Sequence, residues 1–205
     1  MKRRRYKIDA AISPVFVITS ITGWLPVFKI KSLAEKSLNL LENIRREIDI
    51  SVIAFVLMPS HFHGMFRSRN KVDLSRAMQQ WKSRASRLIL DCAEISQPFW
   101  LEHFKESASL YNCSNRQVHQ VWTPRFASTA LESEEQFYAA LEYIHNNPIN
   151  SQLASNLDDY PYSSHHDYAG KDNGYVKIDR ALWLSRSEQA LTREETPMNG
   201  FVRIP

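Results

Sequence analysis

Glycine and cysteine are scarce in this chain, and long hydrophobic runs are absent from it. Only five of its 205 residues are glycine, which argues against a fibrous or low-complexity protein. The two cysteines, Cys92 and Cys113, form no CxxC pair or Cys/His cluster, as expected for reduced thiols without a structural zinc site. The N-terminus lacks the apolar core of a signal peptide, and no run reaches the roughly 18 apolar residues of a membrane span. We therefore expect a soluble cytoplasmic protein that contacts no membrane.

The charged residues are unevenly distributed along the chain. Residues 1–90 hold 17 Lys/Arg and 6 Asp/Glu, a net charge of +11, whereas residues 91–205 hold 9 and 16, a net charge of −7. A basic half is typical of a protein that binds a polyanion such as nucleic acid. Charges that balance across a folded surface would give the same counts, so this pattern alone does not separate the two interpretations.

The hydrophobic pattern predicts an α+β fold. Strands are expected at 14–22, 50–58 and 61–68, a short strand or edge segment at 120–126, and helices at 32–49, 72–91 and 133–148. The order β-α-β-β-α-(β)-α indicates a mostly antiparallel sheet with helices packed on one face, as in ferredoxin-like or RRM-like domains. We expect one domain over residues 1–150, and an extension over 151–205 that packs on it.

Helix ends are predicted from polar residues at capping positions. Ser32 and Glu35 have the spacing of a capping box, and Ser133 has Gln136 as its capping partner. The last helix is expected to stop at Pro148, because proline disrupts the hydrogen bonding of a helix interior.

Two histidines, His61 and His63, flank a phenylalanine in the stretch "VLMPSHFHGMF". Alternate side chains of a strand point to the same side, so both imidazoles share one face and Phe62 lies on the other. Two adjacent imidazoles can hold a divalent metal, but they can equally be polar residues on a solvent-facing strand. The spacing alone favours the second interpretation, because short His-x-His matches arise easily by chance.

A tyrosine and an asparagine stand four residues apart in the stretch "LEYIHNNPIN". Tyr143 and Asn147 share one face of the predicted helix if its last turn holds. Pro148 disfavours the helical conformation at Asn147, so the sequence leaves this register open. Tyr143 lies beside the apolar stripe of the helix, where a tyrosine can present its hydroxyl to a neighbouring site or simply pack at a core boundary.

Together these blocks resemble a known enzyme family. "FVLMPSHFH", "WKSRASRL", "VWTPRF", "YIHNNPI" and "YPYSS", in this order, are similar to the single-tyrosine HUH transposases, and most similar to the repeat-associated (REP-associated) tyrosine transposases of bacteria. HUH denotes His-hydrophobic-His, and the resemblance covers roughly residues 10–170. Ser60 stands where the family usually has asparagine, and serine also suits a turn.

The resemblance implies an enzyme that cuts and rejoins single-stranded DNA through a covalent 5′-phosphotyrosine, acting as a site-specific endonuclease and strand transferase. Tyr143 would be the nucleophile, although a phenol, with an ordinary pKa near ~10, needs help at neutral pH. His61 and His63 would hold Mg²⁺ or Mn²⁺, which polarises the scissile phosphate. Asn147 would complete the metal shell, with Asn146 as the alternative.

The resemblance also implies hairpin DNA with a single-stranded flank as the partner. Basic residues are expected to contact its phosphates, namely Arg3, Arg4, Arg5, Lys82, Arg84 and Arg87. The same residues could form an ordinary solvated surface, and the five tryptophans are expected to be packing residues. Alternative functions are a non-catalytic nucleic-acid-binding module and a metal-dependent hydrolase. Oligomeric state and target DNA stay open.

Overall fold

The computed structural model describes residues 13–68, 71–111 and 118–180 of the chain. Its sheet contains four strands: β1 (Val15–Ser20), β2 (Ser51–Leu57), β3 (His61–Arg67) and β4 (Ala127–Ala130). Their order across the sheet is β2-β3-β1-β4, and every neighbouring pair is antiparallel. Together with the chain order of strands and helices, this is the ferredoxin-like arrangement. The predicted α+β class is therefore confirmed. β3 is one of the two central strands of the sheet.

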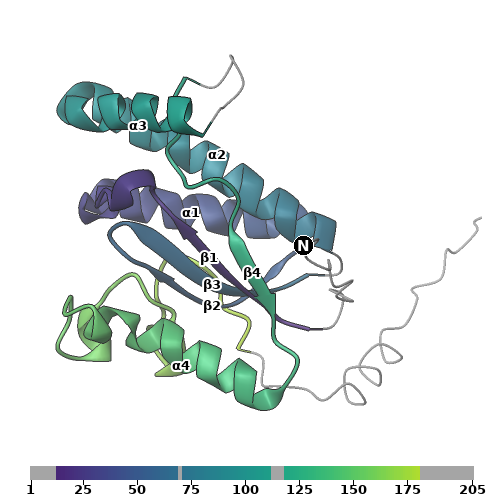
Figure 1. Cartoon of the computed structure of the whole chain (residues 1–205). Helices are drawn as coiled ribbons and strands as arrows, with labels where there is room; N and C mark the ends of the chain where they lie inside the picture. Colours follow the sequence, from purple (N-terminus) through teal and green to yellow (C-terminus); the bar gives the residue numbers. More distant parts are fainter. Residues whose placement is uncertain (1–12, 69–70, 112–117, 181–205) are drawn as a thin grey trace, which may run out of the picture.

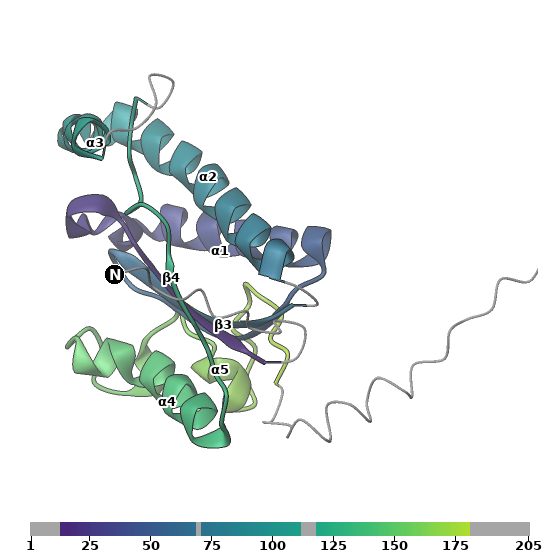
Figure 2. The same cartoon turned by 45° about the vertical axis from the view of Figure 1, so that its right-hand side comes forward.

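The helices cover both faces of this sheet (Figure 1). α1 (Lys31–Ile48), α2 (Lys71–Ser96) and α3 (Pro98–Leu110) lie on one side, and α4 (Glu134–Asn150) with the short α5 (His165–Tyr168) lies on the other, as Figure 2 also shows. The expectation that the helices share one face therefore needs correction. The strands are buried on both sides, which requires a second helical layer.

Two hydrophobic clusters correspond to the two faces. The cluster between the sheet and α1/α2 contains Phe62, Phe66 and Trp81, and the Trp81 indole donates to the Ser37 carbonyl oxygen at 2.8 Å. The cluster under α4 contains Met65, Phe137 and Ile144. Because Phe62 faces α2 and Met65 faces α4, the alternation along β3 directs His61 and His63 toward α4.

Several predicted boundaries change in the structure. α1 is preceded by Ile30, which makes no side-chain cap, so the capping box proposed at its start is wrong. α3 was not predicted, and the fourth strand lies just beyond the expected segment 120–126, which contributes only a single bridge between Trp122 and Ile21. The Ser133 cap on α4 is present, since its side chain accepts from the Gln136 N–H.

α4 does not stop at Pro148, as the sequence suggested, but continues to Asn150. Pro148 lies in the last turn and is buried, and the Ser151 N–H still donates to the Asn147 carbonyl oxygen at 3.0 Å. Packing against the sheet thus outweighs the cost of proline here. The consequence matters for the site, because Tyr143 and Asn147 remain one helical turn apart.

Residues 151–180 run along the outer edge of β2. Ser163 forms a bridge with Val56, the Leu57 N–H donates to the Tyr162 carbonyl oxygen, and the Asp179 N–H donates to the Val52 carbonyl oxygen. This segment therefore satisfies polar groups that an edge strand would otherwise expose. Within the described ranges, no helix combines the length and apolar character needed to cross a membrane.

Candidate active site

The two histidines lie at the start of β3, directly after the turn formed by Pro59 and Ser60. Their rings are side by side on the α4 face, with centroids 4.8 Å apart and planes at 86°. Phe62, between them, points to the other face and contacts Trp81, with ring centroids 4.7 Å apart. The strand register from β1 fixes this placement, because Ser20 pairs with His61 and Ile18 pairs with His63.

Both imidazoles are held in the neutral form. Burial, together with the neighbouring His61, lowers the pKa of His63 to about 3, and only 3% of this residue is exposed. Burial also lowers the pKa of His61, while a hydrogen bond with Asn147 acts in the opposite direction. A neutral imidazole has a nitrogen lone pair available, which is the form that binds metal ions.

α4 brings Asn147 and Tyr143 to the histidine pair. Asn147 is buried, and its side-chain amide lies 3.3 Å from His63 Nε2. The Tyr143 ring is edge-on to His63, with centroids 5.2 Å apart, and also edge-on to Phe16 of β1 at 6.0 Å. Tyr143 is 46% exposed, so part of it is open to solvent while its ring is oriented by these contacts.

This set of side chains has the composition of a small-metal site. Two neutral imidazoles and one amide form a mixed N/O donor set, which would leave most of an octahedral shell to water and substrate. Nδ1 of His63 is buried without a hydrogen-bond partner in the described structure, whereas its Nε2 faces the Asn147 amide. No cluster of three or more His, Cys, Asp or Glu side chains that could hold a metal ion occurs among the described residues. The polar group beside the two imidazoles is the Asn147 amide, and its role as a metal ligand stays a prediction.

The residue before the first histidine has a defined task. Ser60 Oγ lies 3.2 Å from His61 Nδ1, which orients the ring and leaves Nε2 for the site. Serine at this position therefore performs the orienting function that a short polar residue in this turn can supply. Asn146, the alternative ligand, is only half-buried and has no described contact with either histidine.

The single histidine of α4, His145, anchors the helix, and no role was assigned to it from the sequence alone. His145 Nε2 lies 3.0 Å from Ser164 Oγ, and Ser164 bonds both the N–H and the carbonyl oxygen of Phe55 on β2. Burial, reinforced by the nearby His165, lowers the pKa of His145 to about 4. The helix that carries Tyr143 and Asn147 is thereby tied to the edge of the sheet.

The described residues predicted to contact DNA, namely Lys82, Arg84 and Arg87, all lie on α2 and not at this site. α2 covers the sheet face opposite the histidines, and there Arg84 forms a two-pronged ion pair with Glu47 at 2.7 and 2.9 Å. Lys82 donates to the carbonyl oxygens of Thr123 and Arg125, and burial lowers its pKa to about 8. These bonds give Lys82 a structural role, and its contact with DNA stays a prediction.

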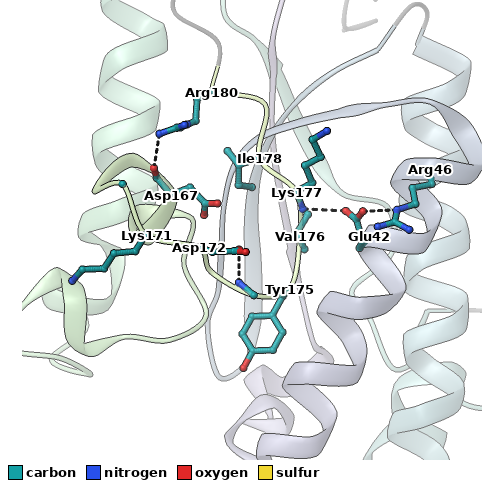
Figure 3. Close-up of a pocket in the computed structure, with 12 residues that line it drawn as sticks. Glu42, Arg46, Asp167, Lys171, Asp172, Tyr175, Val176, Lys177, Ile178 and Arg180 are labelled. Carbon is teal, nitrogen blue, oxygen red and sulfur yellow. Dashed lines mark hydrogen bonds and ion pairs between the residues drawn. The ribbon is translucent and has the colours of Figure 1, made fainter.

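Arg87 of α2 is exposed, whereas the N-terminal arginines Arg3, Arg4 and Arg5 lie outside the described residues. A cavity of about 500 Å³ lies elsewhere, between the C-terminal half of α1 and residues 167–180 (Figure 3). Its lining includes Glu42 and Arg46 but none of Tyr143, His61, His63 or Asn147. The cavity is therefore separate from the candidate active site.

Comparisons with known proteins agree with these features. Residues 25–109, which include both histidines and end before Tyr143, match the family described as transposase, IS200-like. An uncharacterised protein of Haemophilus influenzae is 24% identical over 100 residues, which cover 49% of this chain and 55% of that protein. The chain thus spans about half the length of this curated relative.

Among solved structures, a REP-associated tyrosine transposase bound to a REP hairpin superposes with a TM-score of 0.56. The superposition covers 90% of this chain and 96% of that chain, at 17% sequence identity. It shows that the two chains share a fold. The family match over residues 25–109 and the shared fold agree with the resemblance drawn from the sequence blocks.

Proposed function

We propose that this chain, a relative of the IS200-like transposases, cuts and rejoins single-stranded DNA through a covalent bond to Tyr143. The observation that carries the proposal is the convergence of four side chains from two elements: His61 and His63 from β3, Asn147 and Tyr143 from α4. Hairpin-forming DNA with a single-stranded flank is the proposed substrate, and the cytoplasm is the proposed place of action.

In the proposed reaction, the Tyr143 oxygen forms a bond to phosphorus while the bond from phosphorus to the 3′-oxygen breaks. The phenolic proton passes to solvent, and the leaving 3′-oxygen takes up a proton from solvent, so a 5′-phosphotyrosine and a free 3′-hydroxyl result. The bond energy is retained in the phosphotyrosine, so a second 3′-hydroxyl can reverse the step without ATP.

The chain's own residues orient this step. His61, His63 and Asn147 would hold Mg²⁺ or Mn²⁺, which supplies positive charge that polarises the scissile phosphate. The edge contacts of the Tyr143 ring with His63 and Phe16 restrict where its oxygen can lie. The His145–Ser164 bond keeps α4 at a fixed distance from β3, which preserves a geometry that catalysis tolerates only within about 0.5 Å.

DNA contacts outside the site are proposed for Arg3, Arg4, Arg5, Arg84 and Arg87. Arg84 can exchange Glu47 for a phosphate at small cost, because an exposed ion pair contributes little stability. Since α2 lies on the face opposite the histidines, phosphates bound there belong to a part of the DNA away from the scissile bond.

A direct test is incubation of the protein with end-labelled hairpin oligonucleotides and Mn²⁺, followed by denaturing electrophoresis. A labelled protein–DNA adduct is expected, and it should disappear with a chelator or in the double variant His61→Ala/His63→Ala, while DNA binding remains. Cleavage without an adduct would indicate a hydrolase that activates water. Binding without cleavage, across hairpins of varied sequence, would indicate a nucleic-acid-binding module.

A further inference from the structure

An exposed tryptophan, Trp24, lies beside the histidine pair. It belongs to the short 3-10 turn η1 (Thr22–Trp24) that follows β1, and 63% of it is exposed. Its ring is edge-on to His61, with centroids 5.2 Å apart and planes at 71°. Leaving most of such a large aromatic side chain in water forgoes hydrophobic stabilisation, so its position calls for a reason beyond packing.

The turn that carries Trp24 is tightly built. Trp24 has a φ of 56°, a left-handed conformation that a bulky residue rarely adopts unless its surroundings impose it. Gly23 before it has a φ of 64°, and a side chain there would overlap the His103 ring of α3. Two backbone hydrogen bonds hold the turn in place. The Ile21 N–H donates to the Ser60 carbonyl oxygen, and the Thr22 N–H donates to the Val121 carbonyl oxygen.

These bonds connect the tryptophan turn to the histidine turn itself. Ser60, whose carbonyl oxygen accepts from Ile21, is also the residue whose hydroxyl orients His61. The Phe28 N–H adds a further bond to the Pro59 carbonyl oxygen at 2.9 Å. Trp24 is therefore held at a fixed place relative to the two imidazoles rather than carried on an independent loop.

The aromatic rings are linked by successive contacts in a row that begins with Trp24 and ends with Tyr143. Trp24 contacts His61, His61 contacts His63, and His63 contacts Tyr143. In phosphoryl transfer the attacking and leaving oxygens lie roughly in line on opposite sides of phosphorus. If Tyr143 attacks a phosphate held at the histidines, the leaving 3′-oxygen points toward the Trp24 end of the row.

We propose that Trp24 is a stacking platform for the unpaired base directly 5′ of the scissile phosphate, on the nucleotide that leaves with the 3′-hydroxyl. The inference deepens the function proposed above and rests on it. Stacking accepts any base, because every base has a π face, so this subsite selects single-stranded over duplex DNA rather than a particular sequence. It also places the leaving group for in-line displacement and for rejoining.

The test combines a substitution of Trp24 with the removal of one base from the DNA. Adduct formation is measured with a hairpin substrate that is intact, or that carries one abasic nucleotide at each position near the cut. Wild-type protein should lose about 5- to 150-fold in kcat/KM when the base directly 5′ of the cut is removed, and Trp24→Leu should lose a similar factor with the intact substrate. In the Trp24→Leu variant, removing the base directly 5′ of the cut should lower kcat/KM little further, because the ring that stacks on this base is already gone.

The controls use the chain's own residues. Trp24→Phe keeps an aromatic ring and should retain most of the wild-type kcat/KM. Trp24→Gly removes the ring without strain on the fold, because glycine suits the positive φ at this position. Phe99→Leu removes a comparably exposed ring, 66% exposed on α3, and should change nothing. If the loss caused by Trp24→Leu and the loss caused by an abasic nucleotide instead multiply at every abasic position, Trp24 acts only by supporting His61. In that case the stacking proposal is wrong.

A binding measurement separates this inference from the proposed function. Tyr143→Phe protein is titrated with an oligothymidine of about 12 nucleotides while tryptophan fluorescence is recorded. Stacking predicts quenching that is largely lost when Trp24 is also replaced by phenylalanine. Quenching of this kind, in a protein that forms no adduct with any hairpin, would uphold the platform and refute the transposition chemistry. An active enzyme with unchanged quenching in the Trp24 variant would refute the platform alone.

Discussion

Glu42 of α1 provides a stability prediction with a defined pH dependence. Its carboxylate accepts hydrogen bonds from Arg45 at 2.7 and 2.9 Å. It also accepts from Arg46 at 2.7 Å and from the Lys177 N–H at 3.1 Å, as Figure 3 shows. Only 11% of the side chain is exposed. These bonds tie residues 173–180 to the helix, so replacing Glu42 by glutamine should loosen the segment that covers the edge of β2.

The magnitude follows from the pKa of the carboxyl group. Burial alone would raise the pKa of Glu42, but hydrogen bonds from Arg45, the Lys177 N–H and Arg46 outweigh it and lower the pKa from 4.5 to about 2. Since each pKa unit corresponds to ~1.4 kcal/mol, the ionised group stabilises the fold by about 3 kcal/mol at most. Arg46 is 70% exposed, so screening by water reduces this figure.

The sign of the pH dependence is fixed by the same values. A carboxyl group whose pKa is lower in the folded state stabilises the fold fully above pH 4.5, and this contribution is lost as the pH falls toward 2. Denaturant unfolding at several pH values should therefore show Glu42→Gln destabilised by about 2–3 kcal/mol at pH 7, a sizeable part of the ~5–15 kcal/mol of a typical domain. The difference should shrink as the pH falls below 4.5.

Glu47 provides a matched control on the same helix. It also pairs with an arginine, Arg84, but the pair lies at the surface, with 47% of the Glu47 side chain exposed. Glu47→Gln should leave the unfolding midpoint almost unchanged. A Glu42→Gln variant as stable as the wild type at pH 7, or equally destabilised at pH 7 and pH 3, would contradict the reasoning.

Three further predictions concern the site and its surroundings. Asn147→Ala should raise the Mn²⁺ concentration needed for adduct formation, whereas Asn146→Ala should not; equal effects in a metal titration would remove Asn147 from the proposed shell. His145→Ala and Ser164→Ala should each lower the free energy of unfolding by about 1–3 kcal/mol, and the double variant should lose less than the sum, because both remove one hydrogen bond. Arg87→Ala should lower the slope of log K against log salt by about 0.7–0.9, whereas Lys82→Ala should lower thermal stability without changing the slope; the opposite result would return Lys82 to the DNA surface.

The sequence predicted those parts of the fold that depend on local pattern. Alternation around His61 and His63 gave the correct face for each residue, because successive side chains of a strand point to opposite faces, so Phe62 packs toward α2 while both imidazoles face α4. The helices α1, α2 and α4 were found from their apolar stripes. The placement of α4 on the second face could not be read from the sequence, since its stripe is compatible with either side of the sheet.

One helix was missed although a signal for it existed, and two further features could not be read from the sequence. α3 begins with Pro98 at its first position, and Trp100, Phe104 and Ala108 recur every four residues as its buried face. Because of Pro148, the sequence predicted that the last helix ends before Asn150. Packing against the sheet outweighs the tendency of proline to end a helix, and α4 continues to Asn150. Trp24 could not be distinguished from the buried Trp81, Trp100 and Trp122, because its exposure depends on a strained turn held by distant segments.

The central claim is that Tyr143 attacks DNA, and one comparison tests it most directly. Tyr143→Phe and Tyr138→Phe each remove one hydroxyl from an exposed tyrosine of α4, and only Tyr143 adjoins the histidines. With a labelled hairpin and Mn²⁺, Tyr138→Phe should form the covalent adduct at the wild-type rate, whereas Tyr143→Phe should bind the DNA equally well and form none. An adduct that persists in Tyr143→Phe, or a phosphotyrosine mapped to another position in the wild-type protein, would contradict the assignment.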